Sequence, residues 1–242
     1  MSTEILTENE KKGELKRVRM PGYGIFLSIQ GPWPFLIVSG NLGRESFPFQ
    51  GWFLCFTHLA VLCANGGRKM RIEIVKESVV FQKTDAIVNA ANATMLGGGA
   101  VDGAIHDAAG PELYEFFNRQ RKMWKAGDVE ISPGFKTNAK YILHAVGPIW
   151  HGGNEGEAEK LKSCYVGCLE KAAEAGCASV AFCCISVGVY HYPLEAATRL
   201  AITTVRDWLE QYHTNMLVKF CCYTDREFDC YQELAEEIGI YG

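Results

Sequence analysis

The sequence predicts an α/β domain in which a mixed, largely parallel sheet lies between two layers of helices, a three-layer α/β/α sandwich. From residue 71 onward, short apolar segments rich in β-branched residues alternate with longer amphipathic ones. Several short segments are continuously apolar, as in strands that a parallel sheet buries on both faces. The 242 residues, 48% hydrophobic and 21% charged, are enough for one well-buried domain with an extension.

The elements follow from local patterns in chain order. We expect strands at residues 71–75, 86–91, 139–145, 180–185 and 217–223. We expect helices at residues 101–109, 112–123, 155–175, 193–212 and 226–238. Gly176 is suited to end the third helix in a left-handed conformation, and Pro193 fits the first turn of the fourth. In folds of this class, ligands bind beyond the carboxyl ends of the strands.

The first 69 residues differ from the rest. They hold 8 basic and 5 acidic residues, a net charge of +3. Their apolar run GYGIFLSIQGPWPFLIVSG contains Pro32 and Pro34, which argues against a membrane helix. Two interpretations of this segment stay open. It is either an N-terminal extension of the domain or a segment that lies upstream of a true start at Met70. The second interpretation is suggested by residues 66–69, which can be encoded by a purine-rich run that resembles a ribosome-binding site. The folded domain is expected over residues 70–242.

Charge and cysteine placement exclude several classes of function. Residues 70–242 hold 16 basic and 23 acidic residues, a net charge of −7, which disfavours nucleic acid as the main partner. A membrane partner is not expected either. The ten cysteines include adjacent pairs inside apolar strand-like runs, and they lack the spacing of a zinc site. We therefore expect a reduced, cytoplasmic protein without a bound metal.

Two junctions between a strand and a helix could hold a ligand. The first is the glycine-rich run GGGAVDG at residues 97–103, and the second is SVGVYHYP at residues 186–193. Glycines let the backbone approach a ligand closely, and helix N-termini attract anions, so two such loops could clamp a diphosphate. Neither run fits the Walker or the GxGxxG pattern. Glycines also serve tight turns, so composition alone leaves ligand binding open.

The motifs DAIVNAAN, LGGGAVDGAIHDAAGP, PGFKTNAKYILHAVGPIW and ISVGVYHYP occur in this order. Together they resemble the macro domain family, specifically its branch of bacterial O-acetyl-ADP-ribose deacetylases and mono-ADP-ribosyl hydrolases. The likeness covers residues 71–238. It implies ADP-ribose or O-acetyl-ADP-ribose as the ligand, mono-ADP-ribosylated proteins as further substrates, and no cofactor.

The resemblance also implies the site. Asn92 and Asp102 match the catalytic positions, where an amide holds the ribose hydroxyls and a carboxylate polarises a water molecule. Without the resemblance, the sequence is equally consistent with Asp102 as a carboxylate that the helix dipole favours and with Asn92 as a turn residue. The resemblance places Tyr190 beside the distal ribose and Tyr223 against the adenine. The full set of implied ligand-binding residues is Ser78, Val79, Asn92, Gly97, Gly98, Gly99, Ala100, Val101, Asp102, Ser186, Val187, Gly188, Val189, Tyr190 and Tyr223.

Several positions depart from the family pattern. Ser78 stands where relatives usually carry an aspartate that recognises the adenine amino group, and a hydroxyl accepts that hydrogen bond more weakly. Ala100 replaces a glycine and is expected to require a negative φ. Val187 and His191 replace a threonine and a glycine. His106, one turn after Asp102, has the position of a proton relay, but it is interpreted as a helix-face residue, as lone histidines usually are.

These observations predict a hydrolase that removes ADP-ribose from acidic protein side chains or the acetyl group from O-acetyl-ADP-ribose. The principal alternative is a reader that binds ADP-ribose without turnover, because the changes at Ser78 and His191 alter the implied site. A nucleotide-binding or interaction domain with no preference for ADP-ribose is the third class.

Overall fold

The structure, a computed structural model, describes residues 18–19, 26–30, 35–39, 71–212 and 214–240. The chain divides into two units, Met1–Gly66 and Gly67–Gly242. In the first unit, β1 (Val18–Arg19), β2 (Phe26–Gln30) and β3 (Phe35–Ser39) form an antiparallel sheet. The apolar run interrupted by prolines therefore contains two strands. In the described part of the chain, no helix has both the length and the apolar character needed to cross a bilayer.

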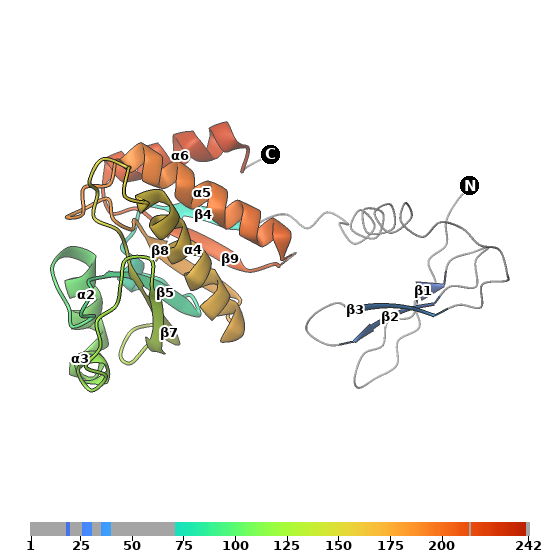
Figure 1. The fold of residues 1–242 in the computed structure, drawn as a ribbon, viewed down its shortest axis with the longest axis horizontal. Coiled ribbons are helices and arrows are strands. Elements are labelled where there is room, and N and C mark those ends of the chain that lie inside the picture. Colours follow the sequence, from blue (N-terminus) through green and yellow to red (C-terminus); the bar gives the residue numbers. More distant parts are fainter. Residues whose placement is uncertain (1–17, 20–25, 31–34, 40–70, 213, 241–242) are drawn as a thin grey trace. The chain divides into compact units, whose positions relative to one another are not determined.

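A six-stranded sheet organises the second unit (Figure 1). Its strands, in spatial order, are β4 (Ile72–Val75), β9 (Leu217–Cys221), β8 (Ser179–Cys183), β5 (Ala86–Ala91), β7 (Tyr141–Val146) and β6 (Val129–Pro133). All neighbouring pairs are parallel except β6 and β7, which are antiparallel. The predicted mixed, largely parallel sheet is confirmed.

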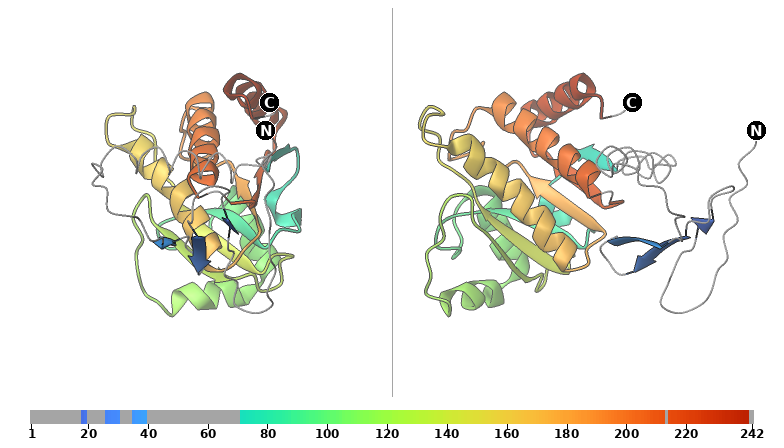
Figure 2. Two further views of the ribbon diagram at one scale, coloured as in Figure 1. Left: turned by 90° about the vertical axis from the view of Figure 1, so that its right-hand side faces the viewer. Right: turned by 45° about the vertical axis from the view of Figure 1, so that its right-hand side comes forward.

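Helices cover both faces of this sheet (Figure 2). They are the 3-10 helix η1 (Val79–Phe81) and the α-helices α2 (Ala100–Ala109), α3 (Pro111–Asn118), α4 (Glu157–Glu174), α5 (Leu194–Gln211) and α6 (Asp225–Ile238). The helices α4, α5 and α6 lie side by side on one face, whereas α2 and α3 lie on the other. The three-layer α/β/α sandwich is confirmed.

The core is densest around the central strands. Five of the six residues of β5 are buried, as are the last four of β8, because helices cover these strands on both faces. Phe182 of β8 packs between two aromatic rings, with centroids 5.2 Å from Tyr165 of α4 and 6.0 Å from Phe220 of β9. Burying one such side chain contributes about 2–3 kcal/mol of transfer free energy. This packing fixes the strand ends at which the site is built.

The structure corrects three details of the predicted elements. The helix expected over residues 112–123 ends at Asn118, because Arg121 has a φ of 46° and the Trp124 N–H donates to the Ala93 carbonyl. The helix expected from residue 155 begins at Glu157, after Gly156 in the left-handed conformation. The edge strand β6 was not predicted at all. The other expected elements are confirmed, with ends that differ by up to two residues.

The eight cysteines of the described residues are all free thiols. Cys183 and Cys221 are register partners on the neighbouring strands β8 and β9, and both are buried. Burial raises the pKa of the Cys183 thiol to about 12, so it stays protonated at neutral pH. Over the same described residues, no three His, Cys, Asp or Glu side chains are grouped so that they could hold a metal ion.

Candidate functional site

Two loops extend from the same edge of the sheet. The first loop, residues 92–99, follows β5 and leads into α2, and the second loop, residues 184–193, follows β8 and leads into α5. β5 and β8 pair in parallel, with Ala86 opposite Val180, so their carboxyl ends point the same way. The topology therefore brings both predicted ligand loops to the edge where open α/β sheets bind ligands.

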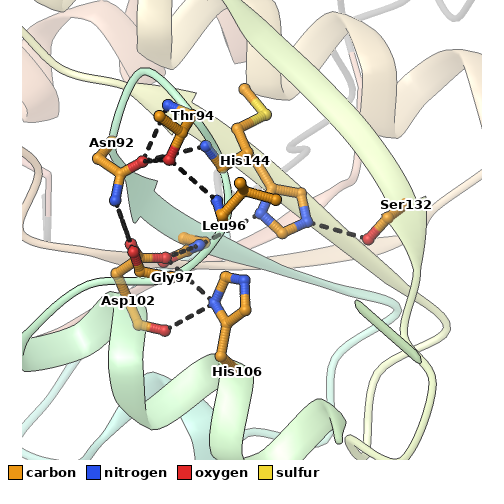
Figure 3. A network of polar contacts seen from close by, with 10 residues as sticks. Asn92, Thr94, Leu96, Gly97, Asp102, His106, Ser132 and His144 are labelled. Carbon is orange, nitrogen blue, oxygen red and sulfur yellow. Dashed lines mark hydrogen bonds and ion pairs between the residues drawn. The ribbon is translucent and has the colours of Figure 1, made fainter. Parts of the chain in front are cut away.

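The Asn92 side chain organises the first loop from its start. Its Oδ1 atom accepts hydrogen bonds from the Thr94 N–H at 2.9 Å, the Thr94 hydroxyl at 2.7 Å and the Met95 N–H at 3.0 Å. Its Nδ2 atom donates to the Gly97 carbonyl at 2.7 Å. One amide thus binds the backbone of three residues of the loop, and Figure 3 shows this arrangement around Asn92 and Thr94. The loop is shaped by hydrogen bonds of its own first residue.

Asp102, in the first turn of α2, turns its carboxylate toward Asn92 (Figure 3). Its Oδ2 atom accepts from Asn92 Nδ2 at 3.3 Å, and its Oδ1 atom accepts from Asn89 Nδ2 at 2.7 Å. Only 4% of Asp102 is exposed. A Cβ atom at Gly98 would lie 3.1 Å from Asp102 Oδ2 and 3.3 Å from Asn92 Nδ2, so a side chain there would crowd the pair. The two predicted catalytic residues therefore meet beneath a glycine.

His106 lies one turn along α2 and contacts Asp102 directly. Its Nδ1 atom is 3.0 Å from the Asp102 carbonyl and 3.3 Å from the carboxylate Oδ1 atom, while Nε2 is buried without a partner. Burial lowers the pKa of His106, but the hydrogen bonds and charge of Asp102 outweigh it, so this pKa is raised above its usual value. His106 is therefore a helix residue whose ring packs against the predicted catalytic carboxylate.

Three residues of the site were not predicted: Asn89 of β5, Ser132 of β6 and His144 of β7. Asn89 and His144 are register partners and fully buried, and Asn89 Nδ2 lies 3.2 Å from His144 Nδ1. On its other side, His144 Nε2 lies 2.9 Å from Ser132 Oγ. Burial, and then the charge of His106, lowers the pKa of His144 to about 3, so the ring is neutral. The sequence signal that could have revealed Asn89 and His144 is that each is a polar residue inside an apolar strand, β5 and β7.

The start of α2 corrects the prediction for Ala100. This residue has a φ of 52°, although it was expected to need a negative φ. Left-handed backbone costs a residue with a Cβ atom about 1–2 kcal/mol. Ala100 is exposed, so its methyl group has room in solvent. The N-cap residue Gly99 supplies no side-chain hydrogen bond, so the first-turn N–H groups keep no cap.

The second loop is anchored beside Gly147, which follows β7. Ser186 has a φ of 66° and a buried hydroxyl without a partner, and a Cβ atom at Gly147 would overlap that hydroxyl. The Tyr190 carbonyl accepts from the Trp150 N–H at 2.9 Å. Burial, and then the charge of Asp102, raises the pKa of the Tyr190 phenol. The charge of Asp102, at the start of α2, therefore acts on a side chain of the second loop.

The tip of the second loop contains the remaining predicted positions. Val187 is half-buried, whereas Gly188 and Val189 are exposed. His191 has a φ of 54°, a conformation that glycine adopts without cost, which accounts for the glycine of the family pattern at this place.

The remaining predicted residues lie at the far side of the same edge. Ser78 and Tyr223 follow the carboxyl ends of β4 and β9, which pair in parallel. Ser78 is the N-cap of η1, and its Oγ atom accepts from the Val80 N–H at 3.4 Å. Val79 is buried, whereas 81% of Tyr223 is exposed.

Comparisons with known proteins decide the family. The family model described as "Macro domain" matches residues 88–201. A macro domain-containing protein of Chlorobaculum tepidum is 48% identical over 162 residues, which are 67% of this chain and 94% of that protein. The chain belongs to the macro domain family.

Named and solved macro domains are also similar to this one. The O-acetyl-ADP-ribose deacetylase of Salmonella newport is 40% identical over 172 residues, which cover 70% of this chain and 96% of that enzyme. The Oceanobacillus iheyensis macrodomain, solved with ADP, matches with a TM-score of 0.68 and 37% identity over 70% of this chain and 92% of that one. A Trypanosoma brucei macrodomain in complex with ADP-ribose gives a TM-score of 0.62 and 38% identity, with 67% of this chain and 68% of that chain covered.

Within this macro domain, the predicted residues form two groups. The Asp102 end comprises the first loop, the second loop, Asn92 and Asp102, which hydrogen bonds hold in place. The Tyr223 end comprises Ser78, Val79 and Tyr223. The sheet order places β8 between β5 and β9, so the two ends lie along one edge of the sheet.

Proposed function

We propose that this macro domain binds ADP-ribose and hydrolyses its derivatives. The reaction would release mono-ADP-ribose from acidic protein side chains, acetate from O-acetyl-ADP-ribose, or both. The observation that carries the proposal is the meeting of Asn92 and Asp102 beneath Gly98, where a bound ligand can approach both side chains. The 40% identity to proteins named O-acetyl-ADP-ribose deacetylase supports it.

Binding would use the backbone of the two loops and the start of α2. Uncapped N–H groups at a helix N-terminus suit a diphosphate, since they donate hydrogen bonds and carry partial positive charge. Asn92 would hold a ribose hydroxyl by exchanging its 3.3 Å contact with Asp102, the longest that its Nδ2 atom makes. Tyr223, exposed at the other end, offers an aromatic face to the adenine.

Hydrolysis would use the Oδ2 atom of the Asp102 carboxylate, which Asn92 would release on binding the ribose. Asn89 engages Oδ1 at 2.7 Å, so Oδ2 is the atom that can accept a hydrogen bond from the attacking water. The water oxygen would attack the acetyl carbonyl or the anomeric carbon at the distal ribose, and a carboxylate that orients or deprotonates it accelerates the step. The released carboxylic acid or ADP-ribose then leaves from the open edge of the sheet.

A second candidate function is binding without turnover. It is favoured by one observation: both oxygens of Asp102 already accept hydrogen bonds from asparagine amides. If the ligand did not displace Asn92 from Oδ2, the amide would compete with water for this oxygen, and a domain in which the amide prevailed would act as a reader of ADP-ribose.

We infer that the partners are ADP-ribose ligands and mono-ADP-ribosylated proteins rather than nucleic acid or membranes. The net charge of −7 over residues 70–242 opposes binding to a polyphosphate backbone. The eight free cysteines suit the reducing conditions of the cytoplasm. A titration with duplex DNA at low salt should give no heat under conditions in which ADP-ribose does.

The proposal is tested with the full chain. Calorimetry with ADP-ribose measures binding, and two assays measure turnover: release of ADP-ribose from a protein mono-ADP-ribosylated on glutamate, and release of acetate from O-acetyl-ADP-ribose. We expect binding together with turnover of at least one substrate. Binding without turnover of either would establish the reader instead, and the absence of binding would overturn both functions.

A further inference from the structure

A chain of buried hydrogen bonds crosses three strands behind the site. It runs from Ser132 of β6 through His144 of β7 and Asn89 of β5 to the Asp102 carboxylate. Figure 3 shows its His144–Ser132 part together with Asp102. We propose that His144 and Ser132 are positioning residues, which orient the Asn89 amide so that its N–H group faces Asp102. The consequence for turnover rests on the proposed function.

The hydrogen bonds of Ser132 determine the tautomer of His144. The Ser132 hydroxyl lies 3.0 Å from the Pro133 carbonyl and 2.9 Å from His144 Nε2. We assign its proton to the carbonyl, which can only accept, so toward the imidazole the hydroxyl oxygen accepts. His144 Nε2 therefore carries the proton and donates to Ser132. Its Nδ1 atom is left with a lone pair, which accepts from Asn89 Nδ2 at 3.2 Å.

The tautomer in turn determines the orientation of Asn89. Both hydrogens of the Asn89 amide are used, one by His144 Nδ1 and one by Asp102 Oδ1, while Asn89 Oδ1 is buried without a partner. A flipped amide would place this oxygen against the imidazole lone pair and the carboxylate, two repulsive contacts. Leaving a buried acceptor without a partner is unfavourable, so a strong constraint must maintain the observed orientation.

The residues around His144 hold its ring in place and keep it neutral. His144 is fully buried, and the edge of the Phe117 ring packs against it with centroids 4.6 Å apart. The ring is neutral because burial and the nearby charge of His106 hold its pKa at about 3. A protonated Nδ1 atom would present a second donor to the Asn89 amide. The sheet thus supplies Asp102 with a donor of fixed direction, leaving Oδ2 for the reaction.

A matched pair of variants separates positioning from packing. In His144→Asn, the amide oxygen can occupy the place of Nδ1 and keep an acceptor for Asn89, whereas His144→Leu has a similar size and no acceptor. Both lose the ring that packs on Phe117, so both should lose thermal stability. We expect kcat to fall by about 100-fold in His144→Leu, the loss that a shift of roughly 1 Å in a catalytic group can cause.

The two variants should differ in kcat and have the same Kd for ADP-ribose. We expect His144→Asn to recover most of the lost kcat, and both folded variants to bind ADP-ribose with the Kd of the parent. Equal losses of kcat in the two variants would reduce His144 to a packing residue and overturn the proposal.

Nitrogen-15 NMR of the full chain tests the orientation without any reaction. The His144 signals, assigned by their loss in His144→Asn, should show a protonated Nε2 and an unprotonated Nδ1 between about pH 6 and 8. Ser132→Ala should allow the other tautomer to appear. A protonated Nδ1 in the parent would overturn the proposal. If the parent binds ADP-ribose without turnover, the proposed function fails, and the NMR result alone then decides the orientation of Asn89.

Discussion

The two ends of the site are built differently. At the Asp102 end, the carboxylate is 4% exposed and accepts hydrogen bonds from two asparagines, and a buried imidazole orients one of them. At the Tyr223 end, the aromatic ring is 81% exposed and Ser78 only caps a short helix. Groups that the fold holds in place spend no free energy on reorganisation during a reaction. An exposed ring needs only to present an apolar face on which a base can stack.

This difference predicts that substitutions at the two ends change different measured quantities. Changes at the Asp102 end should alter turnover, and changes at the Tyr223 end should alter affinity. The substitutions below test this division.

Asp102→Asn should produce the largest effect. The new amide keeps the shape and can still accept from Asn89, but it cannot take a proton from water, so kcat should fall by about 100- to 10,000-fold. The Kd for ADP-ribose, measured by calorimetry, should stay that of the parent. Asp107→Asn, an exposed position on the same helix, is the control and should change neither quantity. A parent-like kcat in Asp102→Asn would remove Asp102 from the mechanism.

Tyr223→Ala should weaken affinity without changing kcat. Stacking of a base on an aromatic side chain contributes about 1–3 kcal/mol, so the Kd for ADP-ribose should rise by about 10-fold. Tyr212→Ala is the matched control, because this partly exposed tyrosine lies at the opposite end of α5 from the second loop. An unchanged Kd in Tyr223→Ala would show that the adenine binds elsewhere.

Ser78→Asp should tighten binding by about 5-fold, since a charged acceptor forms a hydrogen bond stronger by about 1 kcal/mol than a hydroxyl does. The variant should not gain affinity for the hypoxanthine analogue of ADP-ribose, which lacks the amino group. A gain for both ligands would point to a general change of the loop, and a loss for both would place Ser78 outside the base site.

Glu157→Gln should leave affinity at neutral pH unchanged and lower stability. Its carboxylate accepts from the N–H groups of His151, Gly153 and Glu155 at 3.0, 3.1 and 2.6 Å and thereby folds the loop before α4. Burial alone would raise the pKa of Glu157, but these hydrogen bonds lower it from 4.5 to about 2.

Because the folded pKa is depressed, the stabilisation is complete above about pH 4.5 and is lost as the pH falls toward 2. The Tm of Glu157→Gln should therefore be lower than that of the parent at pH 7, and the gap should narrow in acid. A gap that does not change with pH would contradict this role for the charge.

Local patterns were enough to predict the layers, because apolar strands and amphipathic helices alternate along the chain. They did not reveal β6, whose sequence VEISP contains Glu, Ser and Pro and which lies at the edge of the sheet beside β7. Pairing at an edge depends on a neighbour in space, and the five residues themselves carry little strand signal.

The site shows the same limit. Asn92 and Asp102 could be predicted from motifs, whereas the role of His144 depends on its register with Asn89 across two strands that are 55 residues apart. The backbone angle of Ala100 was predicted wrongly for a related reason, because the folded loop, and not the residue itself, imposes the positive φ.

The central claim is that the residues of the Asp102 end hydrolyse derivatives of ADP-ribose. The most direct test offers the full chain an excess of O-acetyl-ADP-ribose and, separately, of a protein mono-ADP-ribosylated on glutamate, and counts the product released per protein molecule. We predict that the count rises past one and keeps rising for at least one substrate. Bound ADP-ribose with no product above the blank in either reaction would contradict the claim.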